Sequence, residues 1–199
     1  TINCNEIRKN NTAQEGDLLI LTKALGTGII TQLMKNDSNN INSALDEAIN
    51  SMTMLNKKAA DIMKNYPVNA CVDITGFGLL GHLYNMISQS NKNCDLKINN
   101  IPIFEGLDSI IDRNNLASGT IGNIKYFDNK LTDLKTINEK IKSIICDAQT
   151  SGGLLLSTPQ DYADEIIDKL NKSGHKKASI LGNVRKKKKF KNKIINFIN

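Results

Sequence analysis

An aspartate beside a glycine-rich turn is the segment of this 199-residue chain with the clearest chemical character. The segment reads CVDITGFGLLGH, from Cys71 to His82, and contains the spacing G-x-G-x-x-G. Glycines permit a tight turn whose backbone N–H groups approach an anion closely. A carboxylate beside such a turn is a ligand that Mg²⁺ takes together with phosphate oxygens and waters. The pattern indicates phosphate handling, through either a dinucleotide or a metal-bound phosphate.

The positions of the surrounding residues disfavour a dinucleotide. In a Rossmann unit the first glycine follows the first strand directly, and an acid at the end of the second strand, about 20 residues on, binds the ribose. Here the residues Asp73–Thr75 separate the strand from Gly76. Asp95 has a suitable distance but stands at the start of the next expected strand, not at its end. We therefore expect no dinucleotide site.

The metal interpretation makes Asp73 the candidate Mg²⁺ ligand. We expect Asp73 at the C-terminal tip of a strand, where carboxylates often face ligand crevices. The turn that follows supplies Thr75, Gly76 and Gly78 as candidate cofactor-binding residues, because its backbone N–H groups suit an anion. The alternative is structural: Asp73 caps the following helix, and the glycines only form the turn.

A second stretch, CDAQTSGGLLLS from Cys146 to Ser157, has a related character. Asp147, Gln149 and two hydroxyl residues precede a pair of glycines and an apolar run. The hydroxyls and backbone N–H groups suit an anion. A tight turn that leads into a buried strand explains the same residues equally well, so both interpretations stay open.

Hydrophobic patterning places both motifs next to strands. Short apolar or alternating runs predict strands at Leu18–Thr22, Val68–Val72, Asp95–Ile103, Gly153–Thr158, Ala178–Val184 and Ile194–Ile198. Some of these strands follow one another without a helix between them. We therefore expect one α+β domain with a mixed sheet covered by helices.

Apolar residues at three- and four-residue steps predict one long helix within residues 39–67, which Pro67 closes. Shorter helices are predicted at Leu79–Ser88, at Glu105–Arg113 and after Thr158, which we interpret as a cap with Pro159 at the first helical position. The segment around Gly119 and Gly122 is interpreted as a loop, and Leu134–Ile145 is ambiguous between helix and strand.

Three segments in order resemble a known family. They are GDLLILTKALGTGI (Gly16–Ile29), LNKKAADIM followed by ACVDITGFGLLGHL (within Leu55–Leu83), and CDAQTSGGLLLS. Together they resemble the C-terminal half of the selenide, water dikinase (selenophosphate synthetase) family. The closing ASILGNV is similar to the last strand region of that family. The wider superfamily includes aminoimidazole ribonucleotide synthetase and thiamine-monophosphate kinase.

The resemblance implies a three-layer α/β/α domain and the conversion of ATP, selenide and water to selenophosphate, AMP and phosphate. It implies that Asp73 joins acids of an N-terminal domain in holding Mg²⁺ on the ATP phosphates. The catalytic residues, among them a reactive cysteine or selenocysteine, are expected in that N-terminal domain. Cys4 lacks their sequence context. Residues 1–199 are thus expected to be one C-terminal domain, inactive alone, of a homodimeric two-domain enzyme.

Three positions depart from the family pattern. Ala24 and Ala148 stand where the family usually has proline. The loss of these prolines gives the two loops more backbone freedom. Gly122 stands where the family has arginine, which leaves the anion contact of that segment without its expected side chain. Two other functions are therefore kept as alternatives: another ATP-dependent synthetase or kinase of the superfamily, and a non-catalytic binding module.

Composition excludes several classes of protein. The four scattered cysteines form no C-x-x-C motif, and with two histidines they indicate reduced thiols in the cytoplasm, not zinc. No apolar run reaches the length of a membrane span. The net charge is +6, but Arg185–Lys193 alone holds seven basic residues. We interpret that run as a solvated hairpin leading into the last strand, within a tail of residues 185–199, and expect no nucleic-acid partner.

Overall fold

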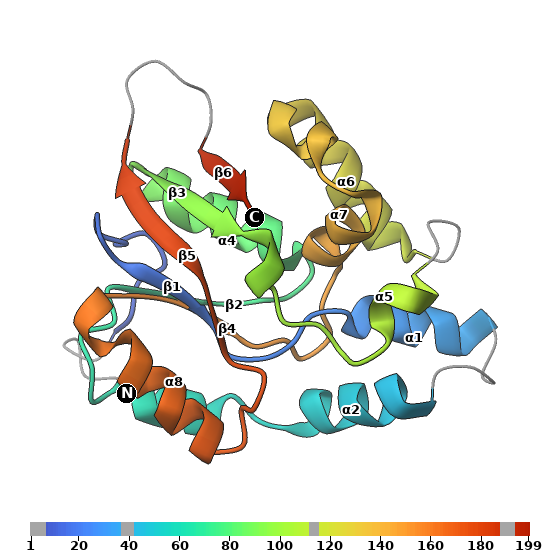
Figure 1. Ribbon diagram of the computed structural model, residues 1–199, viewed down its shortest axis with the longest axis horizontal. Helices are drawn as coiled ribbons and strands as arrows, with labels where there is room; N and C mark the ends of the chain where they lie inside the picture. The colour runs from blue at the N-terminus through green and yellow to red at the C-terminus, as the bar shows by residue number, and fades with distance from the viewer. Residues whose placement is uncertain (1–6, 37–41, 112–115, 188–193) are drawn as a thin grey trace.

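The structure is a computed structural model that describes residues 7–36, 42–111, 116–187 and 194–199. Across these residues, strands form one six-stranded sheet in the order β2-β4-β1-β5-β3-β6 (Figure 1). The strands are β1 (Leu18–Leu21), β2 (Ala70–Asp73), β3 (Lys92–Lys97), β4 (Leu154–Thr158), β5 (Ser179–Lys186) and β6 (Ile195–Ile198). All neighbours are antiparallel except β3 and β6, which are parallel.

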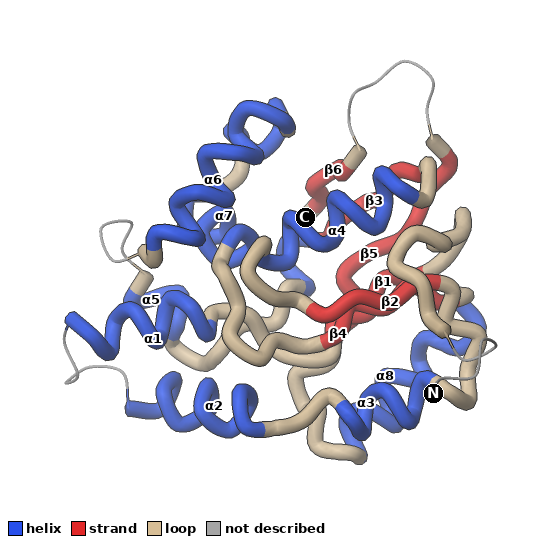
Figure 2. The backbone as a smooth tube through the Cα atoms, turned by 180° about the vertical axis from the view of Figure 1, so that it is seen from behind, coloured by secondary structure: helices blue, strands red, loops and turns tan. Residues whose placement is uncertain are grey.

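Helices cover both faces of the sheet, as Figures 1 and 2 show. Helices α3 (Lys57–Met63) and α8 (Gln160–Lys172) pack on one face against Ile20 and Leu156. The other face, with Leu19, Leu21 and Leu155, belongs to the larger core under α4 (Gly78–Gln89), α6 (Ser118–Lys130) and α7 (Glu139–Cys146). Because successive side chains of a strand point to opposite faces, the LLIL of β1 and the LLL that opens β4 are apolar on both faces. The expected three-layer α+β architecture is confirmed.

Helices α1 (Thr27–Asn36), α2 (Asn42–Thr53) and the short α5 (Leu107–Ile110) extend the larger core beyond one end of the sheet (Figure 1). No helix within the described ranges is long and apolar enough to cross a membrane.

The single long helix predicted within residues 39–67 is wrong. The structure has α2 and α3 instead, interrupted at residues 54–56. Ala44 and Ala48 of α2 pack in the larger core, whereas Ala59 and Met63 of α3 pack on the opposite face of the sheet. Because two consecutive helices with similar apolar spacing produce one continuous stripe, the pattern did not reveal the break.

The expected loop at Gly119 and Gly122 is also wrong, because both glycines lie within α6. Helix α6 is held by the buried side chains of Thr120, Ile124 and Phe127, so packing offsets the poor helix propensity of the glycines. The ambiguous segment Leu134–Ile145 contains the end of a 3-10 turn and most of α7.

Other boundaries shift by several residues. Strand β3 ends at Lys97, and a 3-10 turn over Ile98–Asn100 replaces the last part of the expected strand. The helix expected at Glu105–Arg113 is the four-residue α5 among the described residues. Pro159 is the N-cap of α8, and Thr158 is the last residue of β4, so Thr158 does not cap the helix.

The hairpin expected around the basic run is wrong, because β3 lies between β5 and β6. Strand β6 pairs in parallel with β3, with Cys94 opposite Ile195. Arg185 forms an ion pair with Asp95 at 2.8 Å, and Asn196 donates to the same carboxylate. Residues 188–193 of the run lie outside the described residues.

Candidate functional site

The backbones of the three motifs touch one another because glycines stand at the points of contact. A side chain at Gly152 would collide with the carbonyl oxygen of Ile74, and one at Gly28 with the carbonyl oxygen of Ala148. A Cβ atom at Gly153 would lie 2.7 Å from the backbone nitrogen of Lys23. The turn after β1, the turn after β2 and the turn before β4 therefore form one tightly packed unit.

Asp147 is fully buried and lies against the N-terminus of α1. Its Oδ2 atom accepts hydrogen bonds from the backbone N–H groups of Gly28, at 3.0 Å, and Ile29, at 3.2 Å. The Thr120 hydroxyl donates to Oδ1 at 2.9 Å, and the Gln149 amide donates to Oδ2 at 2.8 Å. Burial raises the pKa of Asp147 to about 6, although these four hydrogen bonds favour the carboxylate.

Gln149 completes the same arrangement. Its Oε1 atom accepts from the backbone N–H groups of Gly26, at 3.1 Å, and Thr27, at 3.3 Å. The free N–H groups at the start of α1 thus bind side chains of the chain itself, which is what a helix N-terminus requires. For the stretch CDAQTSGGLLLS, the structure therefore favours the turn over an anion site.

Lys23, from the first motif, is also committed internally. Its buried ammonium group donates to the carbonyl oxygens of Ser51, Met54 and Ser151 at 3.0, 2.7 and 3.0 Å. Burial lowers the pKa of Lys23. Because two of these carbonyls lie at the end of α2, the ammonium group stabilises the C-terminus of that helix.

Asp73 differs from these residues because its side chain is exposed at the end of β2. Its carboxylate forms no hydrogen bond or ion pair with the described residues. The N-cap of α4 is Phe77, and no side chain binds the free N–H groups there. The capping alternative for Asp73 does not match this geometry, and the carboxylate stays open to a ligand.

The other candidate residues of this turn, which we call the Asp73 loop (residues 73–78), separate into two groups. Gly76 is exposed, with open space around its Cα atom. Gly78 has a φ angle of +66° and donates its N–H to the carbonyl oxygen of Thr75 at 3.0 Å. The N–H of Thr75 also binds within the chain, to the side chain of His82. Gly76 is thus the more accessible position, whereas Thr75 and Gly78 shape the loop.

His82 contacts the Asp73 loop and was not among the residues selected from the sequence. The backbone N–H of Thr75 lies 3.2 Å from Nε2 of His82, and the Thr75 hydroxyl lies 3.1 Å from the same atom. A backbone N–H only donates, so Nε2 is the acceptor and the ring proton resides on Nδ1. Burial lowers the pKa of His82, while the charge of Asp73 acts in the opposite direction. The histidine directly after GFGLLG was the available sequence signal.

Asn123 of α6 binds the loop from the other side. Its amide nitrogen donates to the carbonyl oxygens of Gly76 and Cys146, both at 2.9 Å. A pocket of about 390 Å³ adjoins these contacts and is lined by Phe77, Gly81, Asn85, Asn123, Tyr126 and Phe127. Gly122, where the family pattern has arginine, is exposed on α6 with open space around it.

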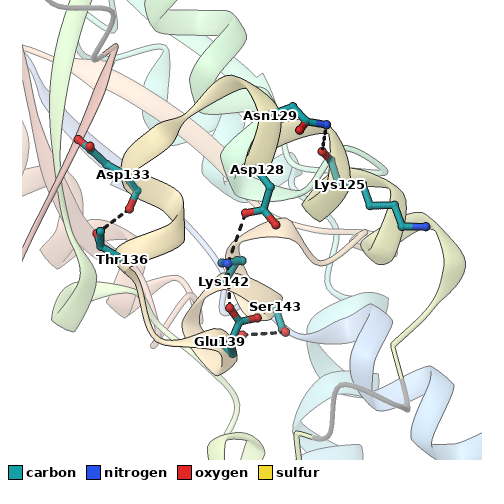
Figure 3. Close-up of polar contacts among 8 residues, drawn as sticks. All are labelled: Lys125, Asp128, Asn129, Asp133, Thr136, Glu139, Lys142 and Ser143. Atoms are coloured by element: carbon teal, nitrogen blue, oxygen red, sulfur yellow. Dashed lines mark hydrogen bonds and ion pairs between the residues drawn. The ribbon is translucent and has the colours of Figure 1, made fainter.

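An ion cluster fixes α6 against α7, as Figure 3 shows. The almost fully buried ammonium group of Lys142 lies 3.3 Å from Asp128 of α6 and 2.9 Å from Glu139 of α7. Burial opposes the charge of Lys142, but the hydrogen bond to Glu139 and the charge of Asp128 outweigh it and raise its pKa. The cluster secures the helix that carries Asn123.

Among the described residues, no group of three or more His, Cys, Asp or Glu side chains could hold a metal ion.

Comparison with known proteins places this chain in a family. The model of the family "AIR synthase related protein, C-terminal domain" matches residues 14–194. The chain is 39% identical over 185 residues to the selenide, water dikinase of Caldanaerobacter subterraneus subsp. tengcongensis, covering 93% of this chain and 53% of that protein. It is 38% identical to the selenide, water dikinase of Aliarcobacter butzleri, covering 92% of this chain and 52% of that protein.

Solved structures share the fold at low sequence identity. Thiamine-monophosphate kinase from Stenotrophomonas maltophilia K279a superimposes with a TM-score of 0.67 at 12% identity, covering 98% of this chain and 54% of that chain. Hydrogenase maturation protein HypE superimposes with a TM-score of 0.62 at 15% identity, covering 90% of this chain and 47% of that chain. The chain spans about half the length of the curated relatives that it matches. It belongs to the family of AIR synthase related proteins and corresponds to their C-terminal domain.

Proposed function

We propose that this chain is the C-terminal domain of a selenide, water dikinase, which converts ATP, selenide and water to selenophosphate, AMP and phosphate. The observation that carries the proposal is its similarity, over 93% of its length at 39% identity, to a relative with that name. The solved structures contribute the fold alone, because their sequence identity is low.

In this proposal, Asp73 is one ligand of a Mg²⁺ ion on the ATP phosphates. An exposed carboxylate without a partner in the described part of the chain fits a site for a hard cation, and Mg²⁺ commonly takes only one or two protein carboxylates. When bound, Mg²⁺ neutralises phosphate charge during the transfer. The exposed backbone of Gly76 would be available to contact the phosphates, while Thr75 and Gly78 keep the loop in shape.

The remaining ligands are proposed to come from the part of the relatives that this chain does not match. We place the ATP-binding segment, the catalytic residues and the main contacts of a homodimer in that N-terminal part. Phe77 and Tyr126, which are 62% and 54% exposed beside the Asp73 loop, offer apolar surface for it to cover. The free thiols of Cys71, Cys94 and Cys146 fit a reducing compartment, so we propose a cytoplasmic enzyme.

The test is the activity of the native polypeptide that contains this chain, followed by phosphorus NMR. We expect selenophosphate from the wild type, and on the order of 100-fold less after Asp73→Asn, because the Mg²⁺ ion that neutralises phosphate charge loses a carboxylate ligand. Asp164→Asn, at an exposed carboxylate of α8, is the matched control. The chain alone should make no selenophosphate.

Two outcomes would contradict the proposal. Equal activities of the two variants would remove Asp73 from the metal site. Turnover of ATP with a different acceptor, and none with selenide, would support another ATP-dependent synthetase or kinase instead.

A further inference from the structure

His82 contacts the Asp73 loop at the residue that sets its direction. Up to Asp73 the chain is fixed by pairing with β4, where Asp73 lies opposite Leu154. Ile74 is fixed by its N–H, which donates to the carbonyl oxygen of Gly153 at 2.8 Å. At Thr75 the chain turns, and there the backbone N–H and the hydroxyl both point to Nε2 of His82.

The other bonds of Thr75 leave its N–H side to His82. Its carbonyl oxygen accepts from the backbone N–H groups of Gly78, at 3.0 Å, and Gln149, at 3.1 Å. Within the described residues, His82 is thus the side chain that holds the donor side of this peptide unit. Gly76 is exposed, with open space around its Cα atom, and its carbonyl oxygen accepts from the Asn123 amide at 2.9 Å. The orientation of Thr75 on one side and the bond to Asn123 on the other therefore set where this backbone points.

We propose that His82 is a positioning residue: its Nε2 atom fixes Thr75, and through Thr75 it sets the direction of the Gly76 backbone toward the ligand of the neighbouring Asp73 carboxylate. The identity of that ligand, Mg²⁺ on a nucleotide phosphate, rests on the function proposed above. The contact between His82 and the loop is independent of that proposed function.

The chemistry of the contact supplies a matched pair of variants. A glutamine side chain places its amide oxygen near the position of Nε2 of histidine, whereas asparagine places it near Nδ1. His82→Gln therefore offers Thr75 an acceptor, and His82→Asn does not, although both introduce a neutral amide. His175→Ala is the control for general destabilisation, because His175 is also buried, binds a hydroxyl through one ring nitrogen and lies after α8, outside the Asp73 loop.

The first readout is hydrogen–deuterium exchange of peptides covering residues 74–78 in the native polypeptide. Loss of a hydrogen bond of ordinary strength should speed exchange on the order of tenfold. We expect this in His82→Ala and His82→Asn, and exchange close to wild type in His82→Gln and His175→Ala. Equal exchange in His82→Ala and wild type would overturn the proposal, as would the same acceleration in His175→Ala. If His82→Ala does not fold, the difference in exchange between His82→Gln and His82→Asn still tests the proposal.

The second readout is the calorimetric Kd of Mg²⁺ in the presence of a non-hydrolysable ATP analogue. We expect the Kd to rise on the order of tenfold in His82→Asn and to stay near wild type in His82→Gln. Faster exchange of residues 74–78 in His82→Asn with an unchanged Kd of Mg²⁺ would overturn the claim that His82 acts on ligand binding. A wild type that binds no Mg²⁺ with the nucleotide would refute the proposed metal site and the role of His82 toward its ligand. The exchange pattern would then still show whether His82 holds the loop.

Discussion

Replacing Asp147 with alanine removes the acceptor of four hydrogen bonds in a fully buried junction. The hydroxyl of Thr120 and the amide of Gln149 can rotate towards other partners, but the backbone N–H groups of Gly28 and Ile29 cannot. Each buried donor left unsatisfied costs about 1–3 kcal/mol, and the carboxylate also stabilises the N-terminus of α1. We expect the free energy of unfolding to fall by about 4 kcal/mol in urea denaturation.

The pH dependence of the stability that Asp147 contributes distinguishes the effect of burial on its pKa from the effect of its hydrogen bonds. Burial raises the pKa of Asp147 from 3.8 to about 6, so the folded chain binds this proton more tightly than the unfolded chain does. The contribution of the group to stability is therefore greatest below pH 4 and is lost as the pH rises through 6. At 1.36 kcal/mol per pKa unit, the loss amounts to about 3 kcal/mol.

Asparagine at position 147 keeps the shape of the side chain but does not titrate. The stability of the wild type relative to Asp147→Asn should thus decline by up to about 3 kcal/mol between pH 4 and pH 7. Urea unfolding of both proteins at matched pH values measures this difference, with Asp164→Asn as an exposed control. A constant difference would refute the reasoning and show that the four hydrogen bonds balance burial. A difference that grows with pH would show that they outweigh it.

Four further substitutions test individual contacts by thermal or urea unfolding. Gly78→Ala should destabilise the chain by about 3 kcal/mol, because φ is +66° and the new Cβ atom would lie 2.8 Å from the carbonyl carbon of Cys146. Gly122→Ala, in an open position of α6, should instead stabilise it by about 1 kcal/mol; a loss would contradict the helical assignment. Lys23→Met should cost about 3 kcal/mol and speed amide exchange at the end of α2, since three carbonyls lose their shared donor. Asn123→Ala should cost about 2 kcal/mol, and unchanged stability would show that its two bonds are dispensable.

The sequence by itself determined the class of fold, most of the strands and the family. Runs such as LLIL and the LLL that opens β4 are apolar because both faces of the sheet are covered, and that requirement is visible in a single segment. Asp73 could be placed at the end of a strand because an apolar run stops there and a glycine turn begins. These signals are local, and each comes from residues adjacent in the chain.

Tertiary structure decided which polar groups remain available. Asp147 and Gln149 bind the N-terminus of α1, which lies more than a hundred residues away, so an apparent anion site is an internal cap. Lys23 binds carbonyl oxygens at the end of α2, 28 and 31 residues away, and β6 takes its parallel position by pairing with β3. Such partners are distant in sequence and are chosen by packing, so spacing along the chain does not predict them.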